Sequence, residues 1–125
     1  YLFITHDINV VRYLSDRIAV MYVGRIMELG ATDQIFEGPN HPYTEALLSA
    51  VPSIDGETAD RIPLTGEIPS PADPPSGCVF HTRCHLFIPG TCDVVDPEMQ
   101  EVAPGHFIKC VIPAEQLVEL QSKRG

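Results

Sequence analysis

Basic residues are scarce in this sequence. Its 125 residues include 8 Lys and Arg against 17 Asp and Glu, which gives a formal net charge of −9 at pH 7. This balance argues against nucleic acid as a partner, because nucleic acids are bound by basic faces. It argues equally against docking on anionic lipid head groups.

Long apolar runs are missing as well. No run approaches the roughly 20 residues that span a bilayer, and the apolar first residues lack the basic flank and cleavage site of a signal peptide. There is no internal repeat and no low-complexity tract. The composition is that of a folded domain, 44% hydrophobic and 20% charged, and its 12 prolines predict many loops.

Regular secondary structure is predicted for the first part of the chain. Residues 1–5 are short, apolar on both faces and bounded by polar residues, as in a buried strand of a parallel sheet. Asp7 is a suitable N-cap for a helix in which Ile8, Val11 and Leu14 recur at helical spacing. Because the first strand needs neighbours that this sequence does not supply, we expect the chain to be a fragment of an α/β domain.

The next segment, "RIAVMYVGRIMELG", predicts two strands around a tight turn. Its apolar residues alternate along the first strand, and Gly24 is the expected turn residue. Two short helices are predicted over residues 32–51. The second is expected to begin at Pro42 and to be capped by Asn40 or His41.

His6 is a candidate ligand-binding residue because it ends the first predicted strand, directly before a helix. In open α/β sheets, ligands bind beyond the carboxyl ends of the strands. A neutral imidazole at that place can donate to and accept from a phosphate oxygen or a water molecule. The alternative is that His6 only caps the strand and bonds to nearby backbone.

Three stretches, "LFITHD", "DRIAVMYVGRIMELG" and "ATDQIFEGPNHPYTEALLSAVP", together resemble the closing segment of the ATP-binding subunit of an ABC transporter. The resemblance implies that His6 is the switch histidine, which contacts the γ-phosphate of ATP and helps to orient the attacking water. The full-length protein is then expected to be an ATPase that binds ATP and Mg²⁺. This chain contains no G-x-x-x-x-G-K-[ST] loop to hold phosphates, so we expect it to be inactive alone.

A second resemblance covers residues 40–113. "NHPYTEALLSAVP" followed by "LTGEIPSPADPPSGCVFHTRC" is similar to the C-terminal extension of ATP-binding subunits that serve oligopeptide and dipeptide importers. Close relatives with this extension serve nickel and other small solutes. The resemblance implies a second ATP-binding subunit and membrane permease subunits as partners, at the cytoplasmic face of the cell membrane. The unpaired apolar strand of residues 1–5 predicts in addition that the fragment self-associates.

The sequence therefore predicts an α/β fragment in three parts. Residues 1–52 are expected to be the C-terminal end of an ABC-type ATPase domain, with a strand, a helix, a β-hairpin and helices in order. Residues 53–113 are expected to form a loop-rich, cysteine-containing extension, and residues 114–125 a tail. The alternative function is a self-contained metal-stapled binding or regulatory module, which the lack of a phosphate loop in the upstream coding sequence would favour.

The cysteines are the sharpest chemical feature of the extension. They are separated by five, seven and seventeen residues, at Cys78, Cys84, Cys92 and Cys110. A small loop-rich module usually needs a covalent or metal cross-link. An even count fits disulfides. Zinc could be held by four thiolates, or by three with His81, His85 or His106, although paired C-x₂-C motifs are missing.

An iron–sulfur cluster also takes four thiolates from loops and tolerates varied spacing. The resemblance implies a [4Fe–4S] cluster in this extension, with Cys78, Cys84, Cys92 and Cys110 as the metal ligands. It also places the chain in the cytosol, where disulfides are rare. We therefore expect the four sulfurs to converge in the fold, with zinc or disulfides as the alternatives in the isolated fragment.

Overall fold

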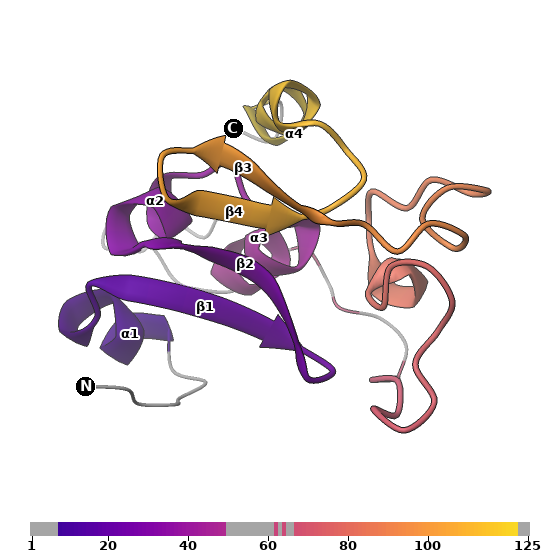
Figure 1. The fold of residues 1–125 in the computed structure, drawn as a ribbon. Helices are drawn as coiled ribbons and strands as arrows, with labels where there is room; N and C mark the ends of the chain where they lie inside the picture. Colours follow the sequence, from indigo (N-terminus) through magenta and orange to yellow (C-terminus); the bar gives the residue numbers. More distant parts are fainter. Residues whose placement is uncertain (1–7, 50–61, 63, 65–66, 123–125) are drawn as a thin grey trace.

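The protein is described here by a computed structural model, which defines residues 8–49, 62, 64 and 67–122. At its centre is an antiparallel sheet in the order β1-β2-β4-β3 (Figure 1). The two pairs of strands come from distant parts of the chain, Arg17–Tyr22 (β1) and Arg25–Ala31 (β2), then Met99–Ala103 (β3) and His106–Lys109 (β4). The sheet thus joins the N-terminal part of the chain to its cysteine-containing part.

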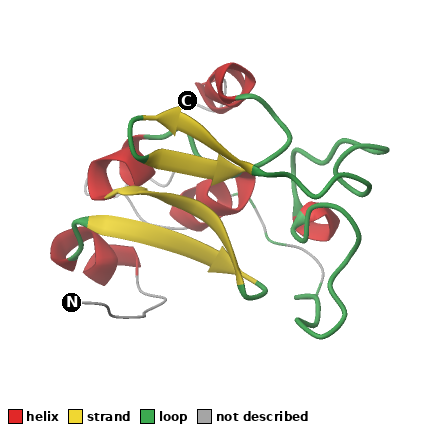
Figure 2. Ribbon diagram, viewed as in Figure 1, coloured by secondary structure: helices red, strands yellow, loops and turns green. Residues whose placement is uncertain are grey.

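Helices surround this sheet. They are Ile8–Leu14 (α1), Thr32–Glu37 (α2), Pro42–Ser49 (α3) and Ala114–Ser122 (α4), with a 3₁₀ turn at His81–Arg83 (η1). Figure 2 shows that the loops and the 3₁₀ turn gather at one end of the sheet. None of the helices in the described part of the chain is long and apolar enough to cross a membrane.

The predicted hairpin is confirmed. Its turn is formed by Val23 and Gly24, whose φ angles are 52° and 75°. Two consecutive positive φ angles match the right-handed twist of the flanking strands, and glycine adopts them without a steric penalty. Along β1 the residues alternate between exposed and more buried positions up to Tyr22, as the apolar pattern predicts.

The helices predicted next are also confirmed as far as they are described. Residues 32–51 contain α2 and α3, and α3 begins at Pro42. His41 is the cap, since its Nδ1 accepts the backbone N–H of Tyr43 at 3.0 Å. The strand predicted at residues 1–5 and Asp7, the predicted N-cap of the helix that follows it, lie outside the described residues, so they and the parallel sheet that the strand implies stay predictions. Self-association through that strand therefore stays a prediction.

The extension, which is predicted to be loop-rich, contains two strands that its sequence does not indicate. Residues 67–98 contain only the 3₁₀ turn, but β3 and β4 follow, and α4 occupies most of the expected tail. β4 pairs with the edge of β2 through Glu28 opposite Ile108 and Leu29 opposite Phe107. These strands are short, and pairing across a long sequence separation stabilises them, so local periodicity does not reveal them. The boundaries at residues 52 and 113 stay predictions.

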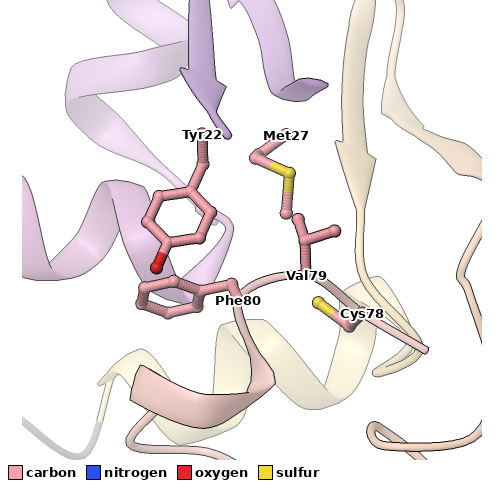
Figure 3. Packing of buried hydrophobic residues seen from close by; sticks show 5 residues of the cluster. All are labelled: Tyr22, Met27, Cys78, Val79 and Phe80. Atoms are coloured by element: carbon pink, nitrogen blue, oxygen red, sulfur yellow. The ribbon is translucent and has the colours of Figure 1, made fainter. Parts of the chain in front are cut away.

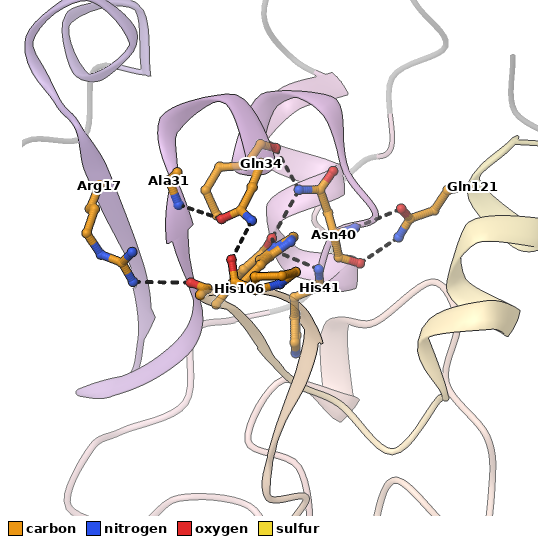
Figure 4. Close-up of polar contacts among 11 residues, drawn as sticks. Arg17, Ala31, Gln34, Asn40, His41, His106 and Gln121 are labelled. Atoms are coloured by element: carbon orange, nitrogen blue, oxygen red, sulfur yellow. Dashed lines mark hydrogen bonds and ion pairs between the residues drawn. The ribbon is translucent and has the colours of Figure 1, made fainter.

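The turn between β3 and β4 is held by side chains of the N-terminal part. Gly105 has a φ of 75°, and its carbonyl accepts a hydrogen bond from Arg17 at 3.2 Å. The neighbouring carbonyl of Pro104 accepts the side-chain amide of Gln34 at 2.9 Å (Figure 4). The second hairpin is therefore fixed to the first one at its turn as well as along its edge.

Two small hydrophobic cores attach the cysteine-containing segment. In the first, Tyr22 and Met27 of the sheet pack against Cys78, Val79 and Phe80 (Figure 3). The Tyr22 and Phe80 rings meet edge to face with centroids 5.1 Å apart. Burying side chains of this size contributes about 1.5–3 kcal/mol each. The loop at Cys78 is therefore part of the core of the molecule.

The second core lies between β4 and α4. It consists of Ile108, Ile112 and Leu117, each at most 3% exposed. Cys110 packs against this cluster. Because the core of this end depends on α4, the C-terminal helix supports the cysteine segment directly.

A buried polar network connects the sheet to the helices. Glu28 on β2 is fully buried and shares a hydrogen bond of 2.6 Å with Nε2 of His106 on β4. Its carboxylate also accepts the backbone N–H of His41 at 2.8 Å and the side-chain amide of Asn40 at 3.2 Å. Asn40 exchanges two hydrogen bonds with Gln121 of α4, at 2.9 and 2.6 Å (Figure 4). This network fixes the start of α3, where His41 stands.

Candidate functional site

The four cysteines line one small cavity at the loop end of the sheet. Its volume is about 10 Å³. It is lined by residues from the start of α3, from the irregular segment 67–98 and from the segment after β4: His41, Pro42, Cys78, His81, Cys84, Leu86, Cys92, Cys110, Val111 and Ile112. Three of the cysteines lie in the irregular segment 67–98, and Cys110 directly follows β4. The structure thus brings together residues that span more than thirty positions of sequence.

Close backbone packing places two of the cysteines side by side. The N–H of Cys78 donates to the carbonyl of Cys92 at 2.8 Å. Gly77 precedes this contact with a φ of 72°, and a Cβ at that position would stand 2.4 Å from the Cys92 oxygen. Only glycine permits this approach, because any other residue would clash with backbone that cannot move aside.

Backbone N–H groups point at the cysteine sulfurs. Leu86 donates to Sγ of Cys84 at 3.4 Å, and Ile112 donates to Sγ of Cys110 at 3.5 Å. In each pair the donor lies two residues after the cysteine. Cys92 receives the N–H of Ile88, four residues earlier, at 3.3 Å. Donors of this kind stabilise a thiolate relative to a thiol.

The thiol of Cys78 has the same local arrangement. Its pKa is raised, mainly because burial disfavours the charged form, and the backbone N–H of Phe80 partly offsets this effect. Phe80 is again two residues after the cysteine. Three of the four sulfurs therefore accept a backbone N–H, and the fourth, Cys78, has the Phe80 N–H nearby; donors of this kind suit a metal-bound thiolate.

Burial keeps the thiols of Cys84 and Cys110 protonated when no cation is present. It raises the pKa of Cys84 to about 12 and that of Cys110 to about 11, more than the nearby N–H groups lower them. All four cysteines are free thiols, so the structure contains none of the disulfides considered as an alternative. A metal ion that binds here must displace the thiol protons.

The cavity is not a preassembled metal site. Within the described part of the chain, no group of three or more His, Cys, Asp or Glu side chains is arranged so that it could hold an ion. A volume of about 10 Å³ corresponds to about one water-sized sphere. The donor chemistry fits a thiolate-bound metal, whereas a four-iron cluster requires the cysteine loops to move apart.

The histidines considered as zinc ligands are divided between the cavity and other partners. His81 lines the cavity, and its Nδ1 is 2.8 Å from the carbonyl of Cys78, which leaves Nε2 as an acceptor. His85 pairs with Glu45 at 2.9 Å, and His106 pairs with the buried Glu28. His81 is therefore the one among these three that the structure brings to the cysteines.

His41 is a cavity residue that sequence reasoning missed. It was expected only as a helix cap, and no spacing rule connects it to cysteines more than thirty residues later. Burial lowers its pKa to about 3, the nearby Lys109 carbonyl partly offsets this, and His85 lowers it further. The ring is therefore neutral at pH 7. Its Nε2 is buried and makes no hydrogen bond of good geometry among the described residues, although the Lys109 backbone carbonyl lies near the ring.

His6, the other candidate site residue, lies outside the described residues. Its assignment to the γ-phosphate of ATP stays a prediction. An apolar groove of about 250 Å³ lies between β1 and the helices α1, α2 and α3. Val11, Val20, Phe36 and Leu47 are among its lining residues.

Comparisons with known proteins agree with this description. The family "Oligopeptide/dipeptide transporter, C-terminal region" matches residues 27–92. The chain is 52% identical over 113 residues to the oligopeptide transport ATP-binding protein AppF of Bacillus subtilis, covering 88% of this chain and 34% of AppF. It is 45% identical over 111 residues to the dipeptide transport ATP-binding protein DppF of Escherichia coli, covering 88% of this chain and 33% of DppF.

A further relative is the putative oligopeptide transport ATP-binding protein YkfD of Bacillus subtilis, 50% identical over 113 residues, which are 88% of this chain and 34% of YkfD. The chain thus spans about a third of the length of the curated relatives it matches. The family match covers more than half of the chain and includes three of the four cysteines. The chain belongs to the oligopeptide/dipeptide transporter C-terminal region family, which confirms the resemblance identified in its sequence.

Proposed function

We propose that the chain forms the C-terminal part of the ATP-binding subunit of an ABC importer for oligopeptides or dipeptides. The family and the relatives named for oligopeptide and dipeptide transport support this proposal. The whole subunit would hydrolyse ATP with Mg²⁺. It would work with a second ATP-binding subunit and with membrane permease subunits, at the cytoplasmic face of the membrane.

In that subunit, His6 would contact the γ-phosphate and orient the attacking water. Loss of one such transition-state contact typically lowers the rate on the order of 10²-fold or more. In the full-length subunit, His6→Ala should therefore nearly abolish ATP turnover and leave ATP binding intact. His85→Ala is the matched control, because His85 is an exposed residue of the extension that pairs with Glu45 of α3. Turnover by His6→Ala at the parental rate would remove His6 from the mechanism.

We infer further that Cys78, Cys84, Cys92 and Cys110 bind a metal centre. The observation that carries this inference is the shared cavity, in which Cys84, Cys92 and Cys110 each accept a backbone N–H. The family resemblance favours a [4Fe–4S] cluster. When bound, the metal would supply a cross-link between loop segments that otherwise contain little regular structure.

The volume of the cavity favours a second candidate, a single zinc ion. About one water-sized sphere of space suits one ion better than a cluster. The Nε2 of His81, which the Cys78 carbonyl leaves as an acceptor, would be available as an additional ligand. Iron and acid-labile sulfide in the purified protein would identify the cluster, and zinc without sulfide would identify the ion.

Replacement of one cysteine tests the metal centre itself. Cys92→Ser should lose the metal from anaerobically purified protein and make residues 67–98 sensitive to proteases. Thr82→Ser is the matched control, since Thr82 is exposed two residues before Cys84. If Cys92→Ser retains the parental metal content and protease resistance, these cysteines are ordinary buried residues.

A further inference from the structure

We propose that the outer edge of β1 and the apolar groove beside it form a docking surface for an extended apolar strand, which comes from the upstream part of the same ATP-binding subunit. The inference rests on the proposed function, because only the complete subunit contains that part. It assigns an occupant to the groove between β1 and the helices α1, α2 and α3.

β1 is an edge strand in the described part of the chain. The order of the sheet is β1-β2-β4-β3, so β1 pairs with β2 on one side only (Figure 1). The carbonyl of Asp16 accepts the N–H of Thr32, the residue opposite it, at 3.0 Å. Because hydrogen-bonded pairs alternate along an antiparallel ladder, Ile18 and Val20 bond to β2, whereas Ala19 directs its N–H and C=O groups outward. Outward backbone groups of this kind are a template for another strand.

The groove runs along this edge of β1 and not over one face of the sheet. Four consecutive residues of the strand line it: Ile18, Ala19, Val20 and Met21. Consecutive side chains of a strand point to opposite faces. A groove that all four residues line therefore lies beside the strand, and a new strand paired with β1 would lay its side chains into it.

The walls of the groove determine the chemistry of its occupant. Among the described residues that line it, none is charged, and Tyr43 and Thr44 are the polar ones. A charged side chain buried against these walls would lose its hydration without gaining a partner. Beyond Arg17, β1 itself has neither a charge nor a proline, which natural edge strands use against pairing. The occupant is therefore uncharged and apolar where it faces the groove.

Two observations favour the upstream part of the subunit as the source of this strand. α1 is the first described element, and its Val11 lines the groove, so the polypeptide that precedes α1 enters beside the groove. The chain spans only about a third of the length of AppF and of DppF, which leaves a part large enough to continue the sheet. Covalent attachment also gives such a strand a higher effective concentration than a second copy of the chain has.

Hydrogen exchange at single backbone amides of β1 tests the proposal without any substitution. The chain alone is compared with the full-length subunit. In the chain, we expect the N–H of Ala19 to exchange rapidly and that of Val20, which bonds to β2, to exchange slowly. In the full-length subunit, exchange at Ala19 should slow on the order of 100-fold or more, because its N–H is then paired and buried. Val20 is the internal control and should be protected in both proteins.

A charge placed in the groove gives a second test. Met21 is 55% exposed in the chain, so Met21→Glu should leave the urea midpoint of the chain nearly unchanged. The same substitution should lower the midpoint of the full-length subunit, where the docked strand would bury the charge. Val118→Glu is the matched control, because Val118 is 50% exposed on α4, away from the groove, and both midpoints should stay unchanged. Equal effects of Met21→Glu in the two proteins would contradict the docking surface.

The exchange rates also identify other occupants. Exchange at Ala19 that is equally fast in the chain and in the full-length subunit would overturn the proposal. Protection already present in the chain would overturn it as well, and protection that rises with chain concentration would identify a second copy as the occupant. ATP hydrolysis by the same full-length preparation separates this inference from the proposed function. Hydrolysis without protection at Ala19 refutes the docking surface alone, whereas protection without hydrolysis supports the docking surface and counts against the proposed function.

Discussion

The buried pair of Glu28 and His106 should dominate the stability of the joined sheet. Their side chains are 0% and 1% exposed, and they meet at 2.6 Å across β2 and β4. In His106→Ala, Glu28 keeps the donors from Asn40 and His41 but loses its shortest one. Removal of one partner from a buried pair costs about 3–5 kcal/mol. This is a large share of the roughly 5–15 kcal/mol that stabilises a typical domain.

Urea unfolding of the complete chain, followed by circular dichroism, measures this loss. With an m-value of about 1–3 kcal/mol per molar urea, the midpoint should fall on the order of 2 M. His106→Ala should cost much less in a Glu28→Gln background, because the charge left unpaired is then absent. His85→Ala, which breaks the more exposed pair with Glu45, should change stability by about 0–1 kcal/mol.

Two results would refute this reasoning. If His106→Ala unfolds at the parental urea concentration, β4 is not held to β2 by this pair. If the loss is the same with Glu28 and with Gln at position 28, the effect comes from the cavity left by the imidazole. In either case the polar network would not be what joins the extension to the first hairpin.

Three further outcomes follow from the structure. Gly77→Ala should abolish metal binding, since its Cβ would stand 2.4 Å from a backbone oxygen. Gly90→Ala is the control, because its Cβ would meet open space and its positive φ should cost only about 1–3 kcal/mol of stability. Equal effects of the two substitutions on metal binding would contradict this. The metal-free, reduced chain should lose stability as the pH rises from about 9 through 11 and 12. The thiols of Cys110 and Cys84, whose pKa values are raised from 9.0 to about 11 and about 12, ionise at lower pH in the unfolded chain than in the folded one. Thermal unfolding midpoints that stay constant across this pH range would refute it. Leu117→Ala should destabilise the chain by about 2–5 kcal/mol and loosen the metal site, whereas the half-exposed Val118→Ala should not; indistinguishable thermal midpoints would show that α4 does not support the second core.

Local sequence patterns were sufficient for the N-terminal half of the described fold. Alternation up to Tyr22, a glycine at position 24 and a proline at position 42 are short-range signals, and each corresponds to a strand, a turn or a helix start in the structure. The physical reason is that hairpins and short helices depend on residues a few positions apart.

The second hairpin could not be predicted in the same way. β4 contains only His106–Lys109, and its pairing with β2 depends on the distant Glu28, which the sequence presents as an ordinary charged residue of a strand. A buried charge in a sheet is favourable only when a partner group pairs with it. The partner of Glu28 is His106, which lies 78 positions later, so a local pattern cannot reveal the pair. The pair of Pro104 and Gly105 was the one local sign of a turn.

The candidate site was predicted in part. The choice of the four cysteines came from their count and their loop-rich surroundings, and the structure places all four on one cavity. The sequence could not indicate that His41 shares the cavity, because the start of α3 packs against cysteines more than thirty positions later only in the fold. Nor could it select among the candidate histidines, which differ only in their partners in the fold.

The most direct test of the metal centre is X-ray absorption at the metal edge of the chain purified without oxygen. The account predicts a bound metal whose first shell consists of sulfur, with metal–sulfur distances of about 2.3 Å if the metal is zinc. Iron with additional iron–iron scattering would identify the cluster. Protein that is fully folded and free of metal, or a first shell made of nitrogen and oxygen alone, would contradict the assignment of the four cysteines.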